Sequence, residues 1–345
     1  MKVTWAISPE GEQLGNNLGY GSTSKLLRMA LEKYCEVVDD GDIYFHYCHP
    51  FFFHPKLGKK NVLYTMFESP DLTYEFYEGF EAADMIMTPS KWCASIFRPA
   101  TEKEVYVCPL GVDTEIFTFK KREWPSFQSD YPRKFRYLYV GAPNSRKFSI
   151  LDEVYRNVIS KMPDCEFYAK TTGANFIPGI AAMYDLGMFV ETDGDTVKYG
   201  NFIADNRMLP TAKLAELYHS AHCFLIPTLG EGWNQVLLEA MATGLPCVVT
   251  GATGHTDFAN STNAYMVKFR KEKLKAEIAR TADGPVEHKK FESYVPDMMD
   301  FCMNVVEVRN NYKRALQIGR QASYDARKIT WDRAGRILFE TLQKL

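Results

Sequence analysis

Short apolar runs that alternate with amphipathic segments constrain the fold of this chain more than any other feature. Examples are KVTWAI before TSKLLRMALEKY, and CFLIPT before NQVLLEAMATG. The apolar runs are bounded by glycine, proline or polar residues, as strands are, and the segments between them have helical spacing. Strands that alternate with helices form βαβ units. The sequence therefore predicts an α/β protein with parallel sheets.

The alternation is interrupted once, in a way that is typical of a linker between domains. Residues 111–134, GVDTEIFTFKKREWPSFQSDYPRK, are polar and basic and show no periodicity. A chain of 345 residues is long enough for two domains. We therefore expect an N-terminal domain, a linker, a C-terminal domain and a last segment that carries the amphipathic TWDRAGRILFETLQKL, with the limits 1–118, 119–134, 135–322 and 323–345.

Composition and charge argue against several classes of protein. The net charge is −2, so no overall basic field drives binding to nucleic acid or to anionic membranes. No apolar run approaches the roughly 18–20 residues of a membrane span, and the N-terminus lacks the layout of a signal peptide. The eight cysteines are scattered, as free thiols in a reducing compartment are. We expect a cytoplasmic protein, with peripheral membrane contact through the aromatic HPFFFHP as an alternative.

Two glutamates frame the start of a predicted helix in TLGEGWNQVLLEAMATGLPCVVTG. Glu231 precedes the helix and Glu239 lies about two turns into it, so their separation is on the order of 10–12 Å. A glycosidase pair lies roughly 5–9.5 Å apart, so these glutamates do not share one bond. The free N–H groups at the helix start between them suit phosphate. This pattern favours a nucleotide-sugar, which has hydroxyl groups at both ends and phosphate in the middle.

The same stretch resembles a family signature. EGWNQVLLEAMATGLPCVVT is similar to the Glu-x7-Glu signature of retaining GT-B glycosyltransferases of glycosyltransferase family 4, and PSKWCASIF, PLGVDTEIF, LPTAKLAELYHSAHCFLIPT and TWDRAGRIL extend the resemblance over most of the chain. It implies the GT-B fold, in which two Rossmann-like domains with parallel sheets face each other across a cleft. The first domain would hold the acceptor and the second the donor, and a C-terminal helix would cross back onto the first domain.

The resemblance also implies roles for the residues of this stretch. Glu239 would bind the ribose hydroxyls of the nucleotide, and Glu231 would bind hydroxyls of the donor sugar. The backbone amides that would meet the sugar and the diphosphate belong to Gly232, Trp233, Asn234, Gln235 and Val236. Asn234 departs from the family pattern, which has glycine at this position. We therefore expect its side chain to re-line the sugar pocket and to influence donor choice.

A second motif, YVGAPNSRKFS, follows a strong strand and resembles the family's diphosphate grip. The family's arginine position is Ala142 here, whereas Lys147 matches its lysine, and Arg146 is a candidate for the missing guanidinium. Positive charge stabilises a leaving diphosphate where no metal does so. We expect catalytic roles for Lys147 and Arg146, and a solvated basic turn is the alternative.

Two motifs of the first domain complete the predicted site. In GNNLGYGSTSKLL, the spacing of Gly19 and Gly21 imitates a dinucleotide fingerprint, but Ser24 takes the third glycine position. The family resemblance instead implies that the backbone of Gly19, Tyr20 and Gly21 contacts the donor. In YTMFESPD, Glu68 follows a strand, so it faces the cleft and is predicted to orient or deprotonate the acceptor hydroxyl. The alternative for Glu68 is a charge at a helix N-terminus.

The predicted function is a metal-independent retaining hexosyl- or pentosyltransferase. It would transfer a sugar from a nucleotide-diphosphate sugar, most plausibly a UDP-sugar, to a carbohydrate or lipid-linked acceptor hydroxyl by a front-face mechanism, with no other cofactor. Two patterns that imitate metal sites, HYCHP and TDGDT, are better explained as a strand end and a turn. The alternatives are the same chemistry on a modified DNA base, as in phage enzymes, with KKREW and RKFR lining a cleft; an NAD-dependent oxidoreductase; and an inactive sugar-nucleotide binding module.

Overall fold

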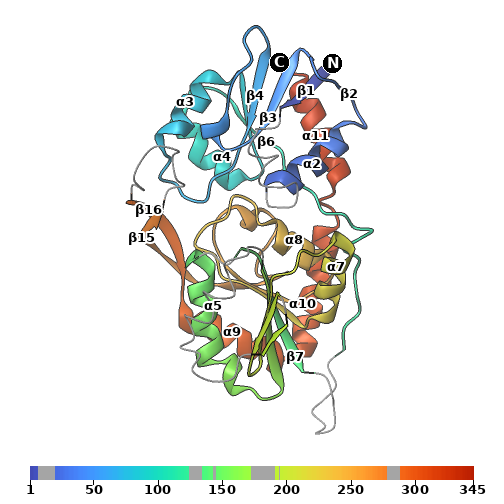
Figure 1. Ribbon diagram of the computed structural model, residues 1–345, viewed down its shortest axis with the longest axis vertical. Helices are drawn as coiled ribbons and strands as arrows, with labels where there is room; N and C mark the ends of the chain where they lie inside the picture. The colour runs from blue at the N-terminus through green and yellow to red at the C-terminus, as the bar shows by residue number, and fades with distance from the viewer. Residues whose placement is uncertain (7–19, 124–133, 143–144, 172–190, 194, 278–287) are drawn as a thin grey trace.

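The computed structural model describes the chain except for residues 7–19, 124–133, 143–144, 172–190, 194 and 278–287, and it describes only the backbone of 145–149, 191–193, 275–277 and 288–289. Two α/β domains follow each other along the long axis of the molecule (Figure 1). The helices are α2 (Tyr20–Leu31), α3 (Tyr74–Ala82), α4 (Lys91–Phe97), α5 (Ser145–Asn157), α7 (Thr211–Ser220), α8 (Gln235–Ala242), α9 (Met298–Asn310), α10 (Tyr312–Ala326) and α11 (Trp331–Leu342).

The first domain is built on a parallel sheet with strand order β2-β1-β3-β4-β5-β6. Its strands are β1 (Lys2–Ala6), β2 (Glu36–Val37), β3 (Ile43–Tyr47), β4 (Lys60–Tyr64), β5 (Met85–Thr88) and β6 (Val105–Val107). Alternate residues of β4 face opposite layers, as the period of two requires. Val62 and Tyr64 share a core with α2, whereas Leu63 packs with Phe76 of α3 and with α4. Helices therefore cover both faces, which explains the near-continuous apolar strands.

The second domain contains an eight-stranded sheet with order β14-β13-β12-β7-β8-β11-β10-β9. Its strands are β7 (Phe135–Val140), β8 (Cys165–Lys170), β9 (Glu191–Asp193), β10 (Thr196–Tyr199), β11 (Phe202–Asp205), β12 (Cys223–Ile226), β13 (Cys247–Thr250) and β14 (Tyr265–Val267). Six of them, from β14 to β11, are parallel, and β10 and β9 add an antiparallel edge. The carboxyl ends of the parallel strands, where ligands bind in open α/β sheets, carry the loops that begin α5 and α8.

The last two helices connect the domains. Helix α10 packs against α8 of the second domain, and α11 crosses back and packs against α2 of the first, as the sequence predicts for a GT-B fold. The crossing follows Ala326, where the Ile329 carbonyl accepts a hydrogen bond of 2.9 Å from Val112 N. Ser323, where we expect the crossing segment to begin, lies within α10. Its hydroxyl donates to the Ala242 carbonyl of the second domain at 2.7 Å.

The expected linker is also docked at its start. Arg122 is buried, and its guanidinium donates to the backbone carbonyls of Ala221, Thr243 and Tyr218 in the second domain. The chain therefore joins the second domain well before β7 begins. A buried guanidinium needs such a set of acceptors, because burial without them costs several kcal/mol.

A hairpin that the sequence analysis does not anticipate follows β14. It consists of β15 (Phe269–Glu277) and β16 (His288–Pro296) and extends toward the first domain (Figure 1). Strand β16 contacts both domains: Tyr294 N donates to the Leu229 carbonyl at 2.8 Å, and the Ser69 hydroxyl donates to the Glu292 carbonyl at 2.9 Å.

Throughout the described segments, no helix is long and apolar enough to cross a membrane.

Candidate active site

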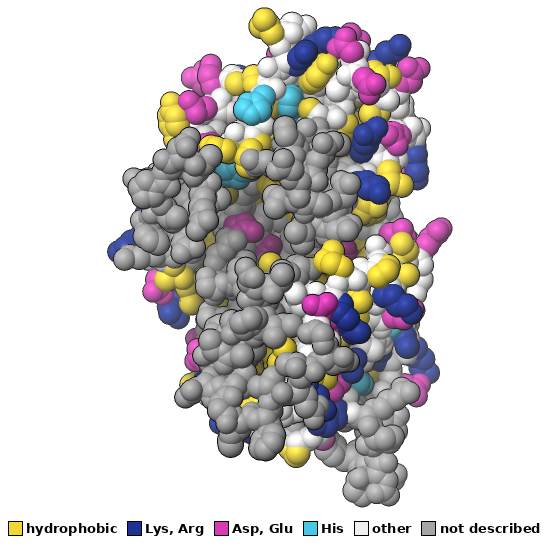
Figure 2. All heavy atoms as spheres, viewed as in Figure 1, with side chains coloured by type: hydrophobic (Ala, Val, Ile, Leu, Met, Phe, Trp, Pro, Cys, Tyr) yellow, Lys and Arg dark blue, Asp and Glu magenta, His cyan; other side chains and the backbone are white. Residues whose placement is uncertain are grey.

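The candidate site lies where loops at the carboxyl ends of the two sheets meet. The loop after β4 packs directly on the loop between β12 and α8. A Cβ atom added to Gly230 would lie 1.9 Å from the Glu68 carbonyl oxygen, and one added to Gly232 would lie 2.7 Å from Met66 Cβ. Glycine is therefore required at both positions for the domains to approach this closely. At the level where the domains meet, acidic side chains reach the surface (Figure 2).

Glu231 is held by the ends of two neighbouring strands of the second sheet. Its side chain is buried, and Oε1 accepts a hydrogen bond of 3.2 Å from the Thr228 hydroxyl. Its backbone N donates to Thr253 Oγ1 at 3.0 Å, and its carbonyl accepts from Gly254 N at 2.8 Å. Because Thr228 follows β12 and Thr253 follows β13, one strand end binds the carboxylate of Glu231 and the other fixes its backbone. The structure thus places Glu231 at the predicted edge of the sheet.

Asn234 begins α8 in a left-handed backbone conformation, with φ 76° and ψ 67°. Most side chains avoid this region, whereas glycine and, at lower cost, asparagine adopt it. The Asn234 Oδ1 atom accepts from Leu237 N at 3.3 Å and so caps the helix. The backbone turn therefore explains why the family pattern has glycine here. The neighbouring Trp233 is buried against Phe258, with ring centroids 4.9 Å apart.

Glu239 lies one turn into α8, on its partly buried face. The Tyr218 hydroxyl lies 3.3 Å from its Oε2 and 3.2 Å from the Val236 carbonyl oxygen, and Gln235 Nε2 lies 3.4 Å from its Oε1. Burial raises the pKa of Glu239 to about 7, although the hydrogen bonds from Gln235 and Tyr218 oppose the shift. A carboxyl group in this state gains charge stabilisation from any further donor that a ligand brings.

Gln235 connects this group to the junction between the domains. Its Nε2 atom also donates to the carbonyl of Gly111 at 2.9 Å, just before the chain leaves the first domain. The position of Glu239 is thus coupled to the chain segment that joins the domains. Sequence reasoning did not anticipate Tyr218 as a partner of Glu239, because the two residues are brought together only by the packing of α7 on α8.

The predicted diphosphate grip lies at the start of α5. The backbone places Arg146 and Lys147 in the first turn of this helix, at the carboxyl end of β7, but their side chains lie outside the described residues. Ala142, at the family's arginine position, is exposed. Because β7 and β12 are neighbours in the sheet, the N-termini of α5 and α8 start from adjacent strands. Both helix starts favour an anion through their free N–H groups.

The first domain contributes a third helix start. Gly19 lies outside the described residues, whereas Tyr20 and Gly21 form the first turn of α2. The Tyr20 hydroxyl donates to the Met66 carbonyl at 3.0 Å and accepts from Met66 N at 3.3 Å. The phenol thus fixes the loop after β4, in which Glu68 is half-buried. The predicted role of Tyr20 is a backbone contact with the donor. Its side chain, in addition, holds the loop after β4 through Met66.

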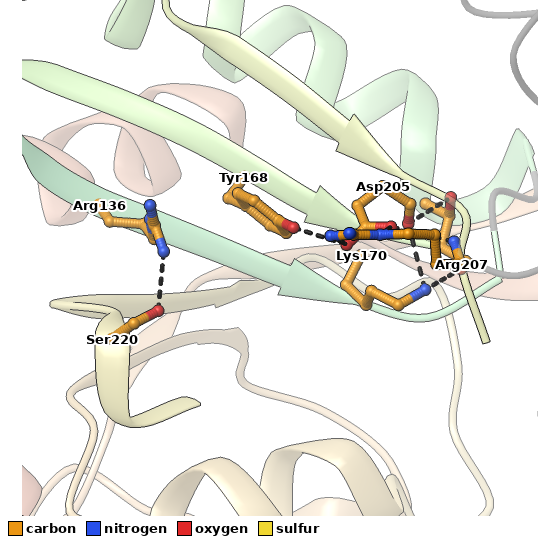
Figure 3. A network of polar contacts seen from close by, with 7 residues as sticks. Arg136, Tyr168, Lys170, Asp205, Arg207 and Ser220 are labelled. Atoms are coloured by element: carbon orange, nitrogen blue, oxygen red, sulfur yellow. Dashed lines mark hydrogen bonds and ion pairs between the residues drawn. The ribbon is translucent and has the colours of Figure 1, made fainter. Parts of the chain in front are cut away.

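A polar network at the carboxyl ends of β8 and β11 was not anticipated (Figure 3). Asp205 is buried and accepts from Arg207 Nε and from the Tyr168 hydroxyl at 2.9 and 2.6 Å. Burial alone would raise the pKa of Asp205, but these hydrogen bonds hold it at about 2. Lys170 Nζ donates to the carbonyls of Thr171 and Asp205 at 2.6 and 3.1 Å, and burial lowers the pKa of Lys170. Charged residues that end apolar strands, Lys170 in β8 and Asp205 in β11, are the signal that would have found it.

The residues of the two patterns that imitate a metal site have other contacts in the structure. His46 pairs with Asn61 Oδ1 at 3.3 Å, and His49 packs edge-on against Phe76. In TDGDT, Asp193 ends β9 opposite Thr196 of β10, as a turn requires. Within the described parts of the chain, no group of three His, Cys, Asp or Glu residues is placed to hold a metal ion.

The described basic residues at the two ends of the linker lie on the other side of the second domain. A cavity of about 790 Å³ is lined by Lys120, Lys121, Arg122, Glu123, Lys134, Arg136, Glu166, Glu216, His219, Ser220, Ala221 and His222. Lys134 and Arg136 lie at the amino end of β7, whereas Glu231, Asn234 and the start of α8 follow the carboxyl end of the neighbouring strand. The described residues of KKREW and RKFR, 120–123 and 134–136, therefore do not line the candidate site.

Comparison with known proteins identifies the fold. A family model described as glycosyl transferases group 1 matches residues 196–283, and the sequence matches no curated protein. Sucrose-phosphate synthase from Thermosynechococcus elongatus is 12% identical, with a TM-score of 0.67 over 99% of this chain and 98% of that one. Anabaena HepE, solved with UDP-glucose, is 11% identical, with a TM-score of 0.65 over 100% of both chains.

A third similar structure is the pneumococcal O-GlcNAc transferase GtfA in complex with UDP and GlcNAc. It is 12% identical, with a TM-score of 0.60 over 96% of this chain and 61% of that one. Identities this low establish the fold alone. The chain has the GT-B fold of these glycosyltransferases, as the sequence predicts.

Proposed function

We propose that the protein is a retaining glycosyltransferase that moves a sugar from a nucleotide-diphosphate sugar, preferably a UDP-sugar, to an acceptor hydroxyl. The observation that carries the proposal is the site around α8. A buried carboxylate, Glu231, precedes the helix start, and a second carboxylate, Glu239, follows it with a pKa near 7. An elongated ligand with phosphate between two hydroxyl-bearing groups matches this order. The group 1 model, which matches residues 196–283, and the UDP complexes among the similar structures support the same donor class.

Each residue has a defined task in the proposed complex. Glu239 accepts hydrogen bonds from the ribose hydroxyls, which stabilise its ionised form, and Glu231 accepts from hydroxyls of the sugar. The starts of α5 and α8 receive the diphosphate, and Lys147 and Arg146 add positive charge to it. Glu68, from the first domain, orients the acceptor hydroxyl. The half-buried loop that carries Glu68 touches Gly230, next to Glu231, so acceptor and sugar would meet where the domains meet.

The proposed transfer step is a front-face displacement. The bond between the anomeric carbon and the diphosphate oxygen breaks as the acceptor oxygen attacks from the same face. The acceptor proton passes to the leaving diphosphate oxygen. The helix starts and the cations of α5 stabilise charge that grows on the leaving group, which is the kind of interaction that accelerates the chemical step.

Two alternatives lose support from the structure. The predicted dinucleotide fingerprint, Gly19 and Gly21, belongs to the first domain. Its sheet has the strand order 2-1-3-4-5-6 rather than the 3-2-1-4-5-6 of the dinucleotide-binding fold, which the parallel strands of the second sheet follow instead; this argues against an NAD site built on that motif. The alternative of a DNA acceptor has KKREW and RKFR lining the cleft. The described residues of these stretches lie away from the candidate site, which removes this support for a DNA acceptor.

The proposal is tested by thermal shift and donor turnover. UDP, GDP or ADP should raise the melting temperature, and NAD should not, because only a ligand that binds the native state stabilises it. With the stabilising base, hydrolysis of the matching nucleotide-sugars should fall at least about 100-fold in Glu231→Ala and Lys147→Ala. Binding without any turnover would identify an inactive binding module instead. Stabilisation by NAD alone, or full activity in both variants, would refute the proposal.

A further inference from the structure

Thr253 has a backbone conformation that threonine seldom adopts. Its φ is 72° and its ψ is −160°, a combination that is found almost only in glycine and that strains a β-branched residue. Among the described residues other than glycine, only Asn234 also has a positive φ, and asparagine tolerates its left-handed turn at lower cost. Thr253 is therefore the more strained of the two. Strain of this kind persists only where the surrounding structure imposes it, and it clusters at functional sites.

The segment that follows Thr253 is fixed between the two domains. Gly254 approaches the loop before α8 so closely that an added Cβ atom would lie 2.1 Å from the Gly232 carbonyl oxygen. Three residues further on, Asp257 Oδ2 accepts a hydrogen bond of 2.7 Å from Lys91 N of the first domain. The backbone at Thr253 therefore cannot relax without disturbing contacts on which the packing of both domains depends.

The hydroxyl of the strained residue binds Glu231. Thr253 Oγ1 accepts from Glu231 N at 3.0 Å, and Gly254 N donates to the Glu231 carbonyl at 2.8 Å, so two successive residues bind both backbone groups of Glu231. Thr253 is 3% exposed, so bulk water does not replace its hydroxyl as an acceptor. Glycine at this position would form the turn without strain, but it would remove the acceptor of the Glu231 N–H group.

We infer that Thr253 is a positioning residue: its hydroxyl fixes the backbone of Glu231, and with it the place of the carboxylate, although this requires a strained backbone. The inference rests on the proposed function, because it takes Glu231 to bind the donor sugar. A displacement of about 1 Å in such a group is enough to slow an enzyme on the order of 100-fold. Thr253 thereby acts on the chemical step through Glu231, without contact to the ligand.

The stability test separates the strained backbone from the hydroxyl. Thr253→Ser keeps the hydroxyl, Thr253→Ala removes it but keeps Cβ, and Thr253→Gly removes both. We expect Thr253→Gly to melt about 2 °C or more above Thr253→Ala, because only glycine relieves the strain. This is the reverse of the usual order, in which alanine is the more stabilising residue.

The activity test uses the same three variants with the nucleotide-sugar that the wild type hydrolyses. The kcat should fall about tenfold or more in Thr253→Ala and Thr253→Gly and stay within about twofold of the wild type in Thr253→Ser. UDP affinity, measured by calorimetric titration, should be unchanged in all three, because UDP lacks the sugar that Glu231 binds. Thr262→Ala is the control: its exposed hydroxyl bonds to Asn260, and the variant should match the wild type in every measurement.

The outcomes separate this inference from the proposed function. Full activity in Thr253→Gly, a loss that Thr253→Ser shares, or a parallel loss of UDP affinity would overturn the positioning role and leave the glycosyltransferase proposal intact. Thr253→Ala at least as stable as Thr253→Gly would overturn the strain. If the wild type turns over none of the UDP-, GDP- or ADP-sugars, the proposed function fails, and hydrogen exchange at the Glu231 amide still decides about the hydroxyl. Faster exchange in Thr253→Ala and Thr253→Gly than in Thr253→Ser would support the contact, and equal exchange would overturn it.

Discussion

At the scale of single residues, the site is a set of polar groups whose environments differ sharply. Glu231 is bound by Thr228 and lies under the loop after β13, whereas Glu239 has only long contacts to Tyr218 and Gln235. Burial without short hydrogen bonds raises the pKa of Glu239 to about 7. A ligand whose hydroxyl groups donate to Glu239 would therefore stabilise its ionised form.

Glu239→Gln should stabilise the unliganded protein and weaken nucleotide binding. The carboxyl group titrates near 7 when folded and near its model value of 4.5 when unfolded. Between these values the folded chain binds more protons, so stability falls as the pH rises through this window, and the penalty is complete above it. The melting temperature of Glu239→Gln should therefore exceed that of the wild type at pH 8, and the difference should vanish near pH 4.5.

The binding measurement completes this test. Uridine affinity of the wild type should fall as the pH drops below 7, because the ionised carboxylate is the better acceptor for ribose hydroxyls, and Glu239→Gln should remove this pH dependence. Glu216→Gln, on the exposed side of α7, should change neither property. A wild-type protein as stable at pH 8 as the variant would contradict the role of burial at Glu239.

At the scale of elements, the hairpin β15–β16 is the least expected feature. It contacts the loop after β4 through the Ser69 hydroxyl and through Glu292 N, which donates to Asp71 Oδ2 at 2.6 Å. Lys273 lies 3.6 Å from the same carboxylate. Tyr294 N of the same strand, β16, donates to the Leu229 carbonyl in the loop between β12 and α8. Strand β16 therefore contacts both loops that carry the site glutamates Glu68 and Glu231.

Asp71→Ala should release the first-domain loop from the hairpin. Hydrogen exchange at the Glu292 amide should accelerate by about tenfold or more, because the amide loses its acceptor. Lys271→Gln is the control: its ion pair with Glu292 is solvent-exposed, with side-chain exposures of 57% and 26%, and such pairs contribute little. Exchange that accelerates equally in β12 would show general destabilisation rather than local release.

At the scale of the whole molecule, the domains are joined on two sides. The crossing into α11 and the contact between Val112 and Ile329 form one connection, and the hairpin forms the other, on the opposite side in Figure 1. The crossing depends on close contact between α11 and α2. A Cβ atom added to Gly335 would lie 2.4 Å from the Ala30 carbonyl oxygen and 2.5 Å from its carbon.

Gly335→Ala should force α11 away from α2. The added methyl group meets backbone atoms, which cannot rotate aside, so we expect a loss of about 1–3 kcal/mol in the free energy of unfolding. The measurement is the urea midpoint, with Arg336→Ala on the exposed face of the same helix as the control, expected within about 0.5 kcal/mol of the wild type. An unchanged midpoint in Gly335→Ala would mean that the helices accommodate the group by a small shift.

The sequence by itself determined the fold class and the edge of the sheet at which the candidate site lies. Apolar runs, glycines and helix starts act over a few residues, so patterns such as CFLIPT before NQVLLEAMATG predict β12, its loop and α8 without tertiary information. The C-terminal helix was predicted by the amphipathic pattern that α11 shows, together with the family resemblance.

Only the tertiary structure decided features that depend on contacts between distant segments. The hairpin shows no apolar alternation that would predict it. It is held by distant segments: Ser69 and Leu229 bond to its backbone, and Phe291 packs against Phe67. Tyr218 reaches Glu239, and Tyr20 reaches Met66, across elements whose relative placement no local pattern encodes. Burial, and with it the raised pKa of Glu239, is a property of the packed protein and exists only once distant segments such as α7 and α8 have come together.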